Sequence, residues 1–508
     1  MSQALSSQAV VAVVGTGAMG AGIAQVAAAA GHTVRLLDNR PGAAQAAIDG
    51  IRAQFDKMVA KGKMSTEASA AAAARLHAAA QLGDLADAAL VVEAIVESLA
   101  AKQKLYSELE AIVSGACIFG TNTSSISVTA IGAALKHPER LAGLHFFDPA
   151  PLMALVEVVS GLATERSVAD TLFATATAWG KTAVHAKSTP GFIVNRVARP
   201  YYAEGLRVLT EGGADCATLD AVMRETGGFR MGPFELMDMI GHDVNFAVTR
   251  SVWNAFFNDP RFLPSLVQQD LVDAGFLGRK TGRGYFDYRA GAVKPDPATE
   301  AAQTLPHAFF ICGMSAVAQA LAARLKAAGV AFALTDSADG RIAQAGEAVL
   351  YVTDGRSATH RAAKSGVANT VLIDLALDYS QTTRMAMTSA LQCSAPATQA
   401  AVGLLQACGL KVSRLADIPG LLVMRTVAML ANEAADAVNQ GVCSAAAADA
   451  AMRLGVNYPK GPLAWADEIG IKTIRDVLVN LGLSYGEDRY RISPLIQRHV
   501  FAKRNIHV

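Results

Sequence analysis

The N-terminal residues alternate short apolar runs with polar turns, as the strands and helices of a parallel sheet do. Residues 10–14 form a β-branched apolar run, residues 18–30 are rich in alanine, and residues 33–37 are apolar again. Short apolar runs bounded by turns predict buried strands, and an alanine-rich stretch of this length predicts a helix. The pattern therefore predicts a strand, a turn, a helix and a second strand in that order.

The turn after the first predicted strand contains the pattern G-x-G-x-x-G at Gly15, Gly17 and Gly20. In this context the first glycine permits a tight turn, the second lets the backbone approach a pyrophosphate, and the third lets the helix pack closely on the strand. Asp38 follows the second strand, where a carboxylate accepts hydrogen bonds from the adenosine ribose and repels a 2′-phosphate. We therefore predict NAD as the cofactor, and Arg40 nearby leaves the strictness of NAD over NADP open.

A weaker copy of this pattern occurs later in the chain. Residues 311–336 repeat residues 13–38 with 8 identities in 26 positions. Two of the three glycines are replaced in the copy, by Ser315 and Ala318. Side chains at these positions would occupy the space that a pyrophosphate needs. The copy is therefore predicted to keep the fold and to bind no cofactor.

A second repeat shows that more than the turn is duplicated. Residues 190–241 match residues 419–470 without a gap, with 16 identities in 52 positions. A match of this length and register indicates two related halves in tandem. In the second half Met424 stands at the position of Asn195, which also argues against a second active site.

A chain of 508 residues is too long for one ordinary core and indicates several domains. The predicted fold class is α/β plus α. The predicted domains are a doubly wound Rossmann-type domain at 1–188, a helical domain at 189–290, a linker at 291–307, a degenerate Rossmann-like domain at 308–417 and a second helical domain at 418–508.

Charge and cysteine content exclude several classes of protein. The formal net charge is +1, and the six cysteines are scattered without a C-x-x-C pair. We therefore expect no nucleic-acid partner, free thiols and no metal site. The first apolar stretch contains the glycine turn and has no basic residue before it, so neither a signal peptide nor a membrane span is expected. These features predict a cytoplasmic protein without a membrane partner.

Motifs spread over residues 8–290 resemble those of the 3-hydroxyacyl-CoA dehydrogenases of fatty-acid oxidation. In chain order they read GTGAMGAGIA, VVEAIVE, TNTSS, GLHFFDPAP followed by LVEVV, STPGFIVNR and GPFELMD. A second, reduced helical domain of the same type follows at 418–508. Within this family, the helical parts most resemble bacterial members that act on 3-hydroxyadipyl-CoA in phenylacetate catabolism.

The resemblance implies NAD-dependent oxidation of a (3S)-3-hydroxyacyl-CoA to a 3-oxoacyl-CoA. His145 would be the general base, oriented by Glu157, because a neutral imidazole with an ordinary pKa of about 6.5 can accept a hydroxyl proton. Ser124 and Asn195 would bind the reacting oxygen, since both side chains can pair with an alcohol or a ketone. The expected cofactor contacts are Gly15, Gly17, Ala18, Met19, Gly20, Asp38, Glu97, Lys102 and Asn122.

Basic residues are candidates for the two charged ends of the substrate. Lys57 and Lys61 lie one helical turn apart with Lys63 just beyond, where a helical hairpin of the family borders the CoA site. A solvated basic helix face is the alternative. Arg230 is a candidate partner for the far carboxylate of a dicarboxylic acyl chain, and a surface position is its alternative.

Asp148 departs from the family pattern, which usually has asparagine at this position. A carboxylate that reaches His145 would favour the protonated imidazole and shift the optimum for oxidation to higher pH, and we expect a modest effect of this kind. A carboxylate that points to solvent would have no effect.

Three other functions stay open at this stage. They are another NAD-dependent dehydrogenase of the same fold, a short-chain 3-hydroxybutyryl-CoA dehydrogenase, and a catalytically inactive structural or binding relative. The helical domains are expected to pair, with apolar contact between residues 200–250 and 425–475 inside the chain. A homo-oligomer formed through these domains is a further expectation.

Overall fold

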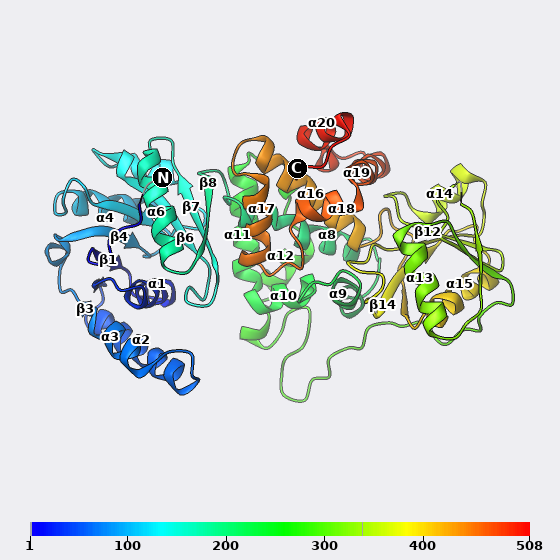
Figure 1. Ribbon diagram of the computed structural model, residues 1–508, viewed down its shortest axis with the longest axis horizontal. Helices are drawn as coiled ribbons and strands as arrows, with labels where there is room; N and C mark the ends of the chain where they lie inside the picture. The colour runs from blue at the N-terminus through cyan, green and yellow to red at the C-terminus, as the bar shows by residue number, and fades with distance from the viewer. Residues whose placement is uncertain (1–2, 338, 508) are drawn as a thin grey trace. The chain divides into compact units, whose positions relative to one another are not determined.

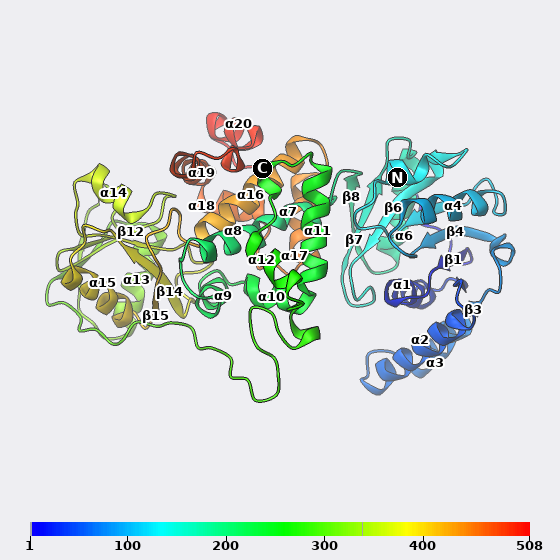
Figure 2. The ribbon, with the colours of Figure 1, turned by 180° about the vertical axis from the view of Figure 1, so that it is seen from behind.

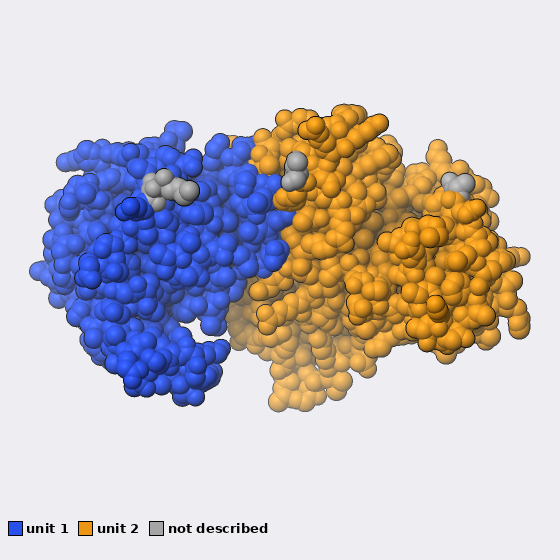
Figure 3. Space-filling view, in the orientation of Figure 1, with its two compact units in different colours: residues 1–196, 440–456 blue, residues 197–439, 457–508 orange. Residues whose placement is uncertain are grey.

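The computed structural model describes residues 3–337 and 339–507, and the chain divides into two compact units. Unit 1 contains residues 1–196 and 440–456, and unit 2 contains residues 197–439 and 457–508 (Figure 3). Of the N-terminal stretch for which no signal peptide is predicted, residues 1–2 lie outside the described part. None of the helices within the described ranges combines the length and the apolar character needed to span a bilayer.

Unit 1 is built on an eight-stranded sheet with the order β3-β2-β1-β4-β5-β6-β7-β8 (Figure 1). The strands are β1 (Val10–Val14), β2 (Val34–Leu37), β3 (Leu76–Ala78), β4 (Ala88–Glu93), β5 (Ile118–Thr121), β6 (Leu141–Phe146), β7 (Leu155–Ser160) and β8 (Thr182–Lys187). β7 runs antiparallel to β6, and β8 runs parallel to β7. The strand order reverses between β1 and β4, where a doubly wound sheet binds its ligand at the carboxyl ends of the strands.

The helices of unit 1 are α1 (Ala18–Ala29), α2 (Ala43–Ala60), α3 (Thr66–Ala74), α4 (Leu99–Glu110), α5 (Val128–Gly132), α6 (Arg166–Ala178) and α17 (Ala445–Gly455), with α7 (Val194–Val197) at its boundary. The predicted first strand and helix form at β1 and α1. Small residues let α1 lie close to the sheet, and a core containing Val11, Val13 and Ile23 fills the contact. The second predicted strand forms as β2.

Unit 2 contains the second sheet, which has seven strands in the order β10-β9-β11-β12-β13-β14-β15. The strands are β9 (Phe309–Cys312), β10 (Ala333–Thr335), β11 (Ala343–Ala345), β12 (Ala348–Val352), β13 (Thr370–Ile373), β14 (Arg384–Ser389) and β15 (Lys411–Arg414). Its helices are α13 (Ala316–Ala327), α14 (Ala358–Ser365) and α15 (Ala395–Ala407). β11 runs antiparallel to β9 and follows β10 within a few residues, so the helical pair that follows β2 in the first half has no counterpart here.

Both helical halves contribute to unit 2 (Figures 1 and 2). The first half supplies α8 (Arg199–Thr210), α9 (Cys216–Glu225), α10 (Pro233–Ile240), α11 (His242–Ala255) and α12 (Leu266–Asp273). The second half supplies α16 (Val423–Asn439), α18 (Pro462–Ile469), α19 (Ile471–Tyr485) and α20 (Pro494–Ala502). α8 packs directly against α16, so the two halves meet as expected.

The contact between the helical halves is less apolar than predicted. Aromatic rings do meet there, with the centroids of Tyr201 and Tyr458 5.4 Å apart. The same contact also holds buried charges, because Glu204 pairs with Arg425 at 2.9 Å and with Arg489 at 3.1 Å. Ion pairs of this kind are stable when buried only because each charge meets its partner.

Candidate active site

His145 and Glu157 lie opposite each other on β6 and β7. The distance from His145 Nδ1 to Glu157 Oε2 is 2.6 Å, and the two residues are 5% and 0% exposed. Because Nδ1 faces the carboxylate, Nε2 is the nitrogen that a substrate hydroxyl can reach. The rings of Phe147 and Phe192 flank the imidazole at centroid distances of 4.5 and 5.7 Å. The pair has the geometry of a general base oriented by an acid.

Glu157 has a second structural task. Its Oε1 accepts hydrogen bonds from the backbone N–H groups of Ile193 and Val194, each at 3.0 Å. These groups lie at the start of a helix, where backbone donors have no partner in the preceding turn. One carboxylate therefore fixes both the imidazole of His145 and the helical turn that carries Asn195.

The predicted polar neighbours of His145 come together at the same edge of the sheet. Asn122 Oδ1 accepts a hydrogen bond from the backbone N–H of Phe146 at 2.8 Å, next to His145. Asn195 Nδ2 lies 3.5 Å from the backbone oxygen of Ser124. The structure thus brings Ser124, Asn122 and Asn195 to the carboxyl-end region that contains the base.

Lys102 pairs with exposed Glu97 and with buried Glu93, which was not among the predicted site residues. Lys102 Nζ lies 2.6 Å from Glu93 Oε1 and 3.2 Å from Glu97 Oε2. Burial alone would raise the pKa of Glu97, but the hydrogen bond from Thr123 and the charge of Lys102 lower it. The arrangement shows Lys102 holding Glu97 in place, and direct contact of either residue with the cofactor stays a prediction.

The glycine turn fits a dinucleotide. Gly15 has a φ of +92°, and a Cβ there would lie 2.4 Å from the backbone oxygen of Ala94. A Cβ at Gly20 would lie 1.8 Å from the backbone oxygen of Gly15, so both positions exclude a side chain. A Cβ at Gly17 would meet nothing within 4 Å. The turn therefore leaves open space at the N-terminus of α1, where backbone N–H groups attract a pyrophosphate.

The remaining predicted cofactor contacts lie beside this turn. Ala18 is exposed and Met19 half-buried in the first turn of α1. Asp38 Oδ2 accepts hydrogen bonds from Thr16 N at 2.9 Å and Thr16 Oγ1 at 2.8 Å, and Arg40 Nε lies 3.0 Å from Oδ1. The Arg40 guanidinium holds the pKa of Asp38 well below its usual range. The carboxylate is therefore ionised at any pH near neutrality, as an acceptor for ribose hydroxyls must be.

Asp38→Ala is expected to weaken the preference for NAD. The substitution removes both a charged hydrogen-bond acceptor, worth about 1.5–3 kcal/mol, and the repulsion of a 2′-phosphate. The ratio of kcat/KM for NAD to that for NADP should fall by about tenfold or more. Steady-state kinetics with both cofactors measure this ratio. Asp49→Ala, an exposed position on α2, serves as the control. An unchanged ratio in the Asp38 variant would show that this carboxylate does not select the cofactor.

In the second half, the turn that corresponds to the glycine turn contains a serine that caps the following helix. Ser315, at the position of Gly17, lies at the N-terminus of α13, where its Oγ accepts a hydrogen bond from Ala318 N at 3.2 Å. A backbone donor that a pyrophosphate would use is therefore already occupied. This contact supports the prediction that the second half binds no cofactor.

The reacting pair is also lost from the second half. β14 and β15 pair in the register of β7 and β8, so the offset of 229 residues extends back through the sheet. At this offset Asp374 stands at the position of His145 and Ala386 at the position of Glu157. The carboxylate of Asp374 accepts the backbone N–H groups of residues 422–424 at 2.8–2.9 Å. It caps the helix as Glu157 does, but without an imidazole beside it.

A cavity of about 980 Å³ in unit 1 is lined by α1, α2 and the loop after β6. Lys57, Lys61 and Lys63 line this cavity, and Asp148 lies on the opposite loop. Asp148 is exposed, and among the described residues no hydrogen bond or ion pair joins it to His145. The pH effect expected from a direct contact therefore has no structural basis. Arg230 is exposed in unit 2 and does not line this cavity.

Lys181 fixes the loop that carries Asp148, and no sequence pattern marked it. Its Nζ donates hydrogen bonds to the backbone oxygens of Ala150 at 2.6 Å and Met153 at 2.8 Å. Burial lowers the pKa of this ammonium group, which pairs with no carboxylate of the described chain. The loop between the strands of His145 and Glu157 is thus held at the cavity wall.

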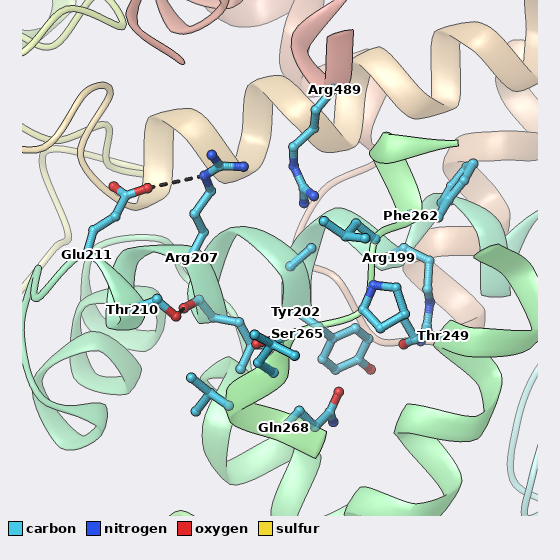
Figure 4. Close-up of a pocket in the computed structure, with 16 residues that line it drawn as sticks. Arg199, Tyr202, Arg207, Thr210, Glu211, Thr249, Phe262, Ser265, Gln268 and Arg489 are labelled. Carbon is cyan, nitrogen blue, oxygen red and sulfur yellow. Dashed lines mark hydrogen bonds and ion pairs between the residues drawn. The ribbon is translucent and has the colours of Figure 1, made fainter. Parts of the chain in front are cut away.

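A second cavity, of about 340 Å³, lies inside unit 2 between α8 and residues 262–268 (Figure 4). Three guanidinium groups line it: Arg207 pairs with Glu211, Arg489 pairs with Glu204, and Arg199 donates a hydrogen bond to Thr249 Oγ1 at 3.0 Å. None of the predicted site residues lines this cavity. It is therefore not the site that the sequence motifs describe.

Fold and site together define a class of protein. A doubly wound sheet with a dinucleotide turn and a buried His–Glu pair beside it is typical of a nicotinamide-dependent dehydrogenase that acts on a hydroxyl group. Among the described residues, no group of three or more His, Cys, Asp and Glu side chains could hold a metal ion.

Comparison with protein-family models identifies the family. Residues 10–189 match the model "3-hydroxyacyl-CoA dehydrogenase, NAD binding domain", and residues 191–288 and 420–506 match its C-terminal domain. Residues 350–419 match a "3-hydroxybutyryl-CoA dehydrogenase reduced Rossmann-fold domain". The chain therefore belongs to the 3-hydroxyacyl-CoA dehydrogenase family and is an NAD-dependent enzyme of this class. The predicted fold class, with its degenerate second Rossmann domain, is confirmed.

Individual relatives match either the whole chain or one half. The 3-hydroxyadipyl-CoA dehydrogenase of Escherichia coli K12 is 45% identical over 488 residues, which is 96% of each chain. A crystal structure of an Escherichia coli K12 3-hydroxybutyryl-CoA dehydrogenase has a TM-score of 0.88 at 43% identity and covers 99% of each chain. A probable 3-hydroxybutyryl-CoA dehydrogenase of Bacillus subtilis is 38% identical over 276 residues, which is 54% of this chain and 96% of the relative.

Proposed function

We propose that this enzyme oxidises (3S)-3-hydroxyadipyl-CoA in phenylacetate catabolism, with His145 as the general base. The observation that carries the catalytic part is the 2.6 Å contact between His145 Nδ1 and Glu157 Oε2 in a buried setting. The proposed identity of the acyl group is based on a relative that is 45% identical over nearly the whole chain and whose name specifies 3-hydroxyadipyl-CoA. The name of the similar crystal structure specifies the 3-hydroxybutyryl group, so chain length is the point to test.

The residues at the site divide the reaction between them. His145 Nε2 takes the proton of the substrate hydroxyl, and the carboxylate of Glu157 stabilises the imidazolium that forms. Ser124 and Asn195 hydrogen-bond the reacting oxygen both as an alcohol and as a ketone. NAD bound at the glycine turn supplies the hydride acceptor. The reverse reaction uses the same groups, with His145 returning the proton.

The CoA part of the substrate is proposed to bind in the 980 Å³ cavity of unit 1. Its size suits a cofactor-sized ligand, and pockets of this kind combine apolar walls with a few charged groups. Lys57 and Lys63 are exposed cations at its rim and would pair with the CoA phosphates. Arg230 is exposed and does not line this cavity, and it stays a candidate partner for the far carboxylate of the acyl chain.

NADH formation with a panel of thioesters tests the proposal. The panel comprises 3-hydroxyadipyl-CoA, 3-hydroxyhexanoyl-CoA and 3-hydroxybutyryl-CoA, so that one pair differs only in the terminal carboxylate. We expect the highest kcat/KM for the adipyl thioester. Preference for the butyryl thioester would support the short-chain alternative, and absence of turnover with every thioester would indicate a binding protein.

A further inference from the structure

A segment of the second helical domain lies against the sheet of the first half. Residues 440–456 belong to unit 1 (Figure 3), and α17 packs on β7 and β8. Val442 O accepts a hydrogen bond from Lys187 N at 2.9 Å, at the outer edge of β8. Gln440 Oε1 accepts one from Arg196 Nη1, also at 2.9 Å. The second half therefore contacts both the strand that carries Glu157 and the residue next to Asn195.

The last residue of α17 fits against the residues that support the catalytic pair. A Cβ at Gly455 would lie 2.7 Å from Leu155 Cδ2, 3.0 Å from Val194 Cγ2 and 3.6 Å from Phe147 Cε1. The backbone of Gly455 has no positive φ, so a glycine is needed here for lack of space and not for its backbone conformation. No side chain fits here without moving a neighbour.

Each of the three neighbours has a direct connection to His145 or Glu157. Leu155 begins the strand that carries Glu157, and Val194 donates its backbone N–H to Glu157 Oε1. The ring of Phe147 packs on the imidazole of His145. A side chain at Gly455 would therefore press on the side chains of Leu155 and Val194, whose backbones hold Glu157 in place, and would contact the ring that packs on His145.

The sheet of the second half has a corresponding helix contact, but a side chain takes the place of the glycine. α9, from the first helical domain, packs on β14 in unit 2, so each half gives one helix to the sheet of the other half. Thr226 stands at the position of Gly455, and its hydroxyl donates a hydrogen bond to Arg384 O at 2.8 Å. The helix that packs on the sheet without the His–Glu pair thus has a side chain at this position, Thr226. The helix that packs on the sheet with the pair has none, at Gly455.

We infer that the second helical domain completes the reaction site of the first half and that Gly455 is a positioning residue for His145 and Glu157. This inference rests on the proposed function, in which that pair is the base and its orienting acid. On this inference, a half that has lost its cofactor turn and its histidine still contributes to turnover. The second half supplies the wall against which the pair is held.

The test compares Gly455→Ala with a variant that restores the space. Gly455→Ala should lower kcat with a 3-hydroxyacyl-CoA by about ten- to a hundredfold, because small displacements of reacting groups have effects of this size. The KM for NAD should stay nearly unchanged. Adding Leu155→Val removes the methyl group nearest to the new Cβ and should recover most of the lost kcat. Gly482→Ala, on α19 with nothing closer than 3.9 Å, serves as the control.

The possible outcomes separate positioning from stability. Thermal unfolding is measured for every variant, and a double variant that recovers the melting temperature but not kcat would overturn the inference. Should Gly455→Ala not fold, Gln440→Ala carries the test, since it removes a part-buried hydrogen bond to Arg196 and should lower kcat several-fold. Parental kcat in that variant would then overturn the inference. Lack of turnover by the parent would instead contradict the proposed function.

Discussion

His145→Gln is expected to lower kcat for 3-hydroxyacyl-CoA oxidation by about 10²–10⁴-fold, the usual contribution of a positioned general base. Glutamine can still form a hydrogen bond to Glu157, so the buried carboxylate keeps a partner, but an amide cannot accept the substrate proton. Binding of NAD should be nearly unchanged, because the glycine turn and Asp38 are untouched. Steady-state kinetics and a calorimetric NAD titration measure the two effects separately.

A second histidine variant separates the loss of the base from a change of histidine in general. His77→Gln, at an exposed position on β3, is this control and should keep the kcat of the parent. A His145 variant that keeps kcat within about tenfold would remove this residue from the role of base.

Glu157→Ala is expected to damage both turnover and stability. Loss of the acid that orients a catalytic histidine lowers kcat by about 10⁴-fold in other enzymes, and we expect at least about 10²-fold here. The substitution also leaves the buried N–H groups of Ile193 and Val194 without their acceptor, at a cost of about 1–3 kcal/mol for each group. Kinetics and chemical denaturation measure the two losses.

Asp374→Ala is the matched comparison, because Asp374 performs the same capping task in the second half. It accepts three backbone N–H groups and should cost a similar free energy of unfolding when removed. It has no histidine beside it, so kcat of the folded variant should stay close to that of the parent. Equal losses of kcat in the two variants would show that Glu157 acts through stability alone.

Most of the fold could be predicted from the sequence because its signals are local. The first strand, glycine turn and helix follow from residues 10–30, and the duplication follows from a gap-free match between residues 190–241 and 419–470. The pairing of α8 with α16 follows from the same duplication. The buried pair of Glu204 with Arg425 does not, because it joins residues far apart whose charge gives no hint of burial.

The same distinction applies to the site. His145 and Glu157 lie in apolar strands within motifs that resemble those of the family, and this resemblance predicted their roles. Lys181 and Gly455 act through contacts across the fold, with backbone oxygens in one case and three side chains in the other. A lone lysine or glycine in a sequence carries no signal of such a contact. Asp374 was hidden for a related reason, since too few identities survive around it to show that it stands at the position of His145.

The duplicated chain is expected to have one reaction site, and a calorimetric titration of the full chain with NAD measures the number of cofactor sites. The open space at Gly17 and the helix-capping Ser315 at the corresponding position predict a stoichiometry of one NAD per chain. Gly17→Ser, which copies the second turn into the first, should abolish or strongly weaken this binding. A stoichiometry of two NAD per chain would show a second cofactor site, and binding that survives Gly17→Ser unchanged would show that NAD does not bind at the first glycine turn.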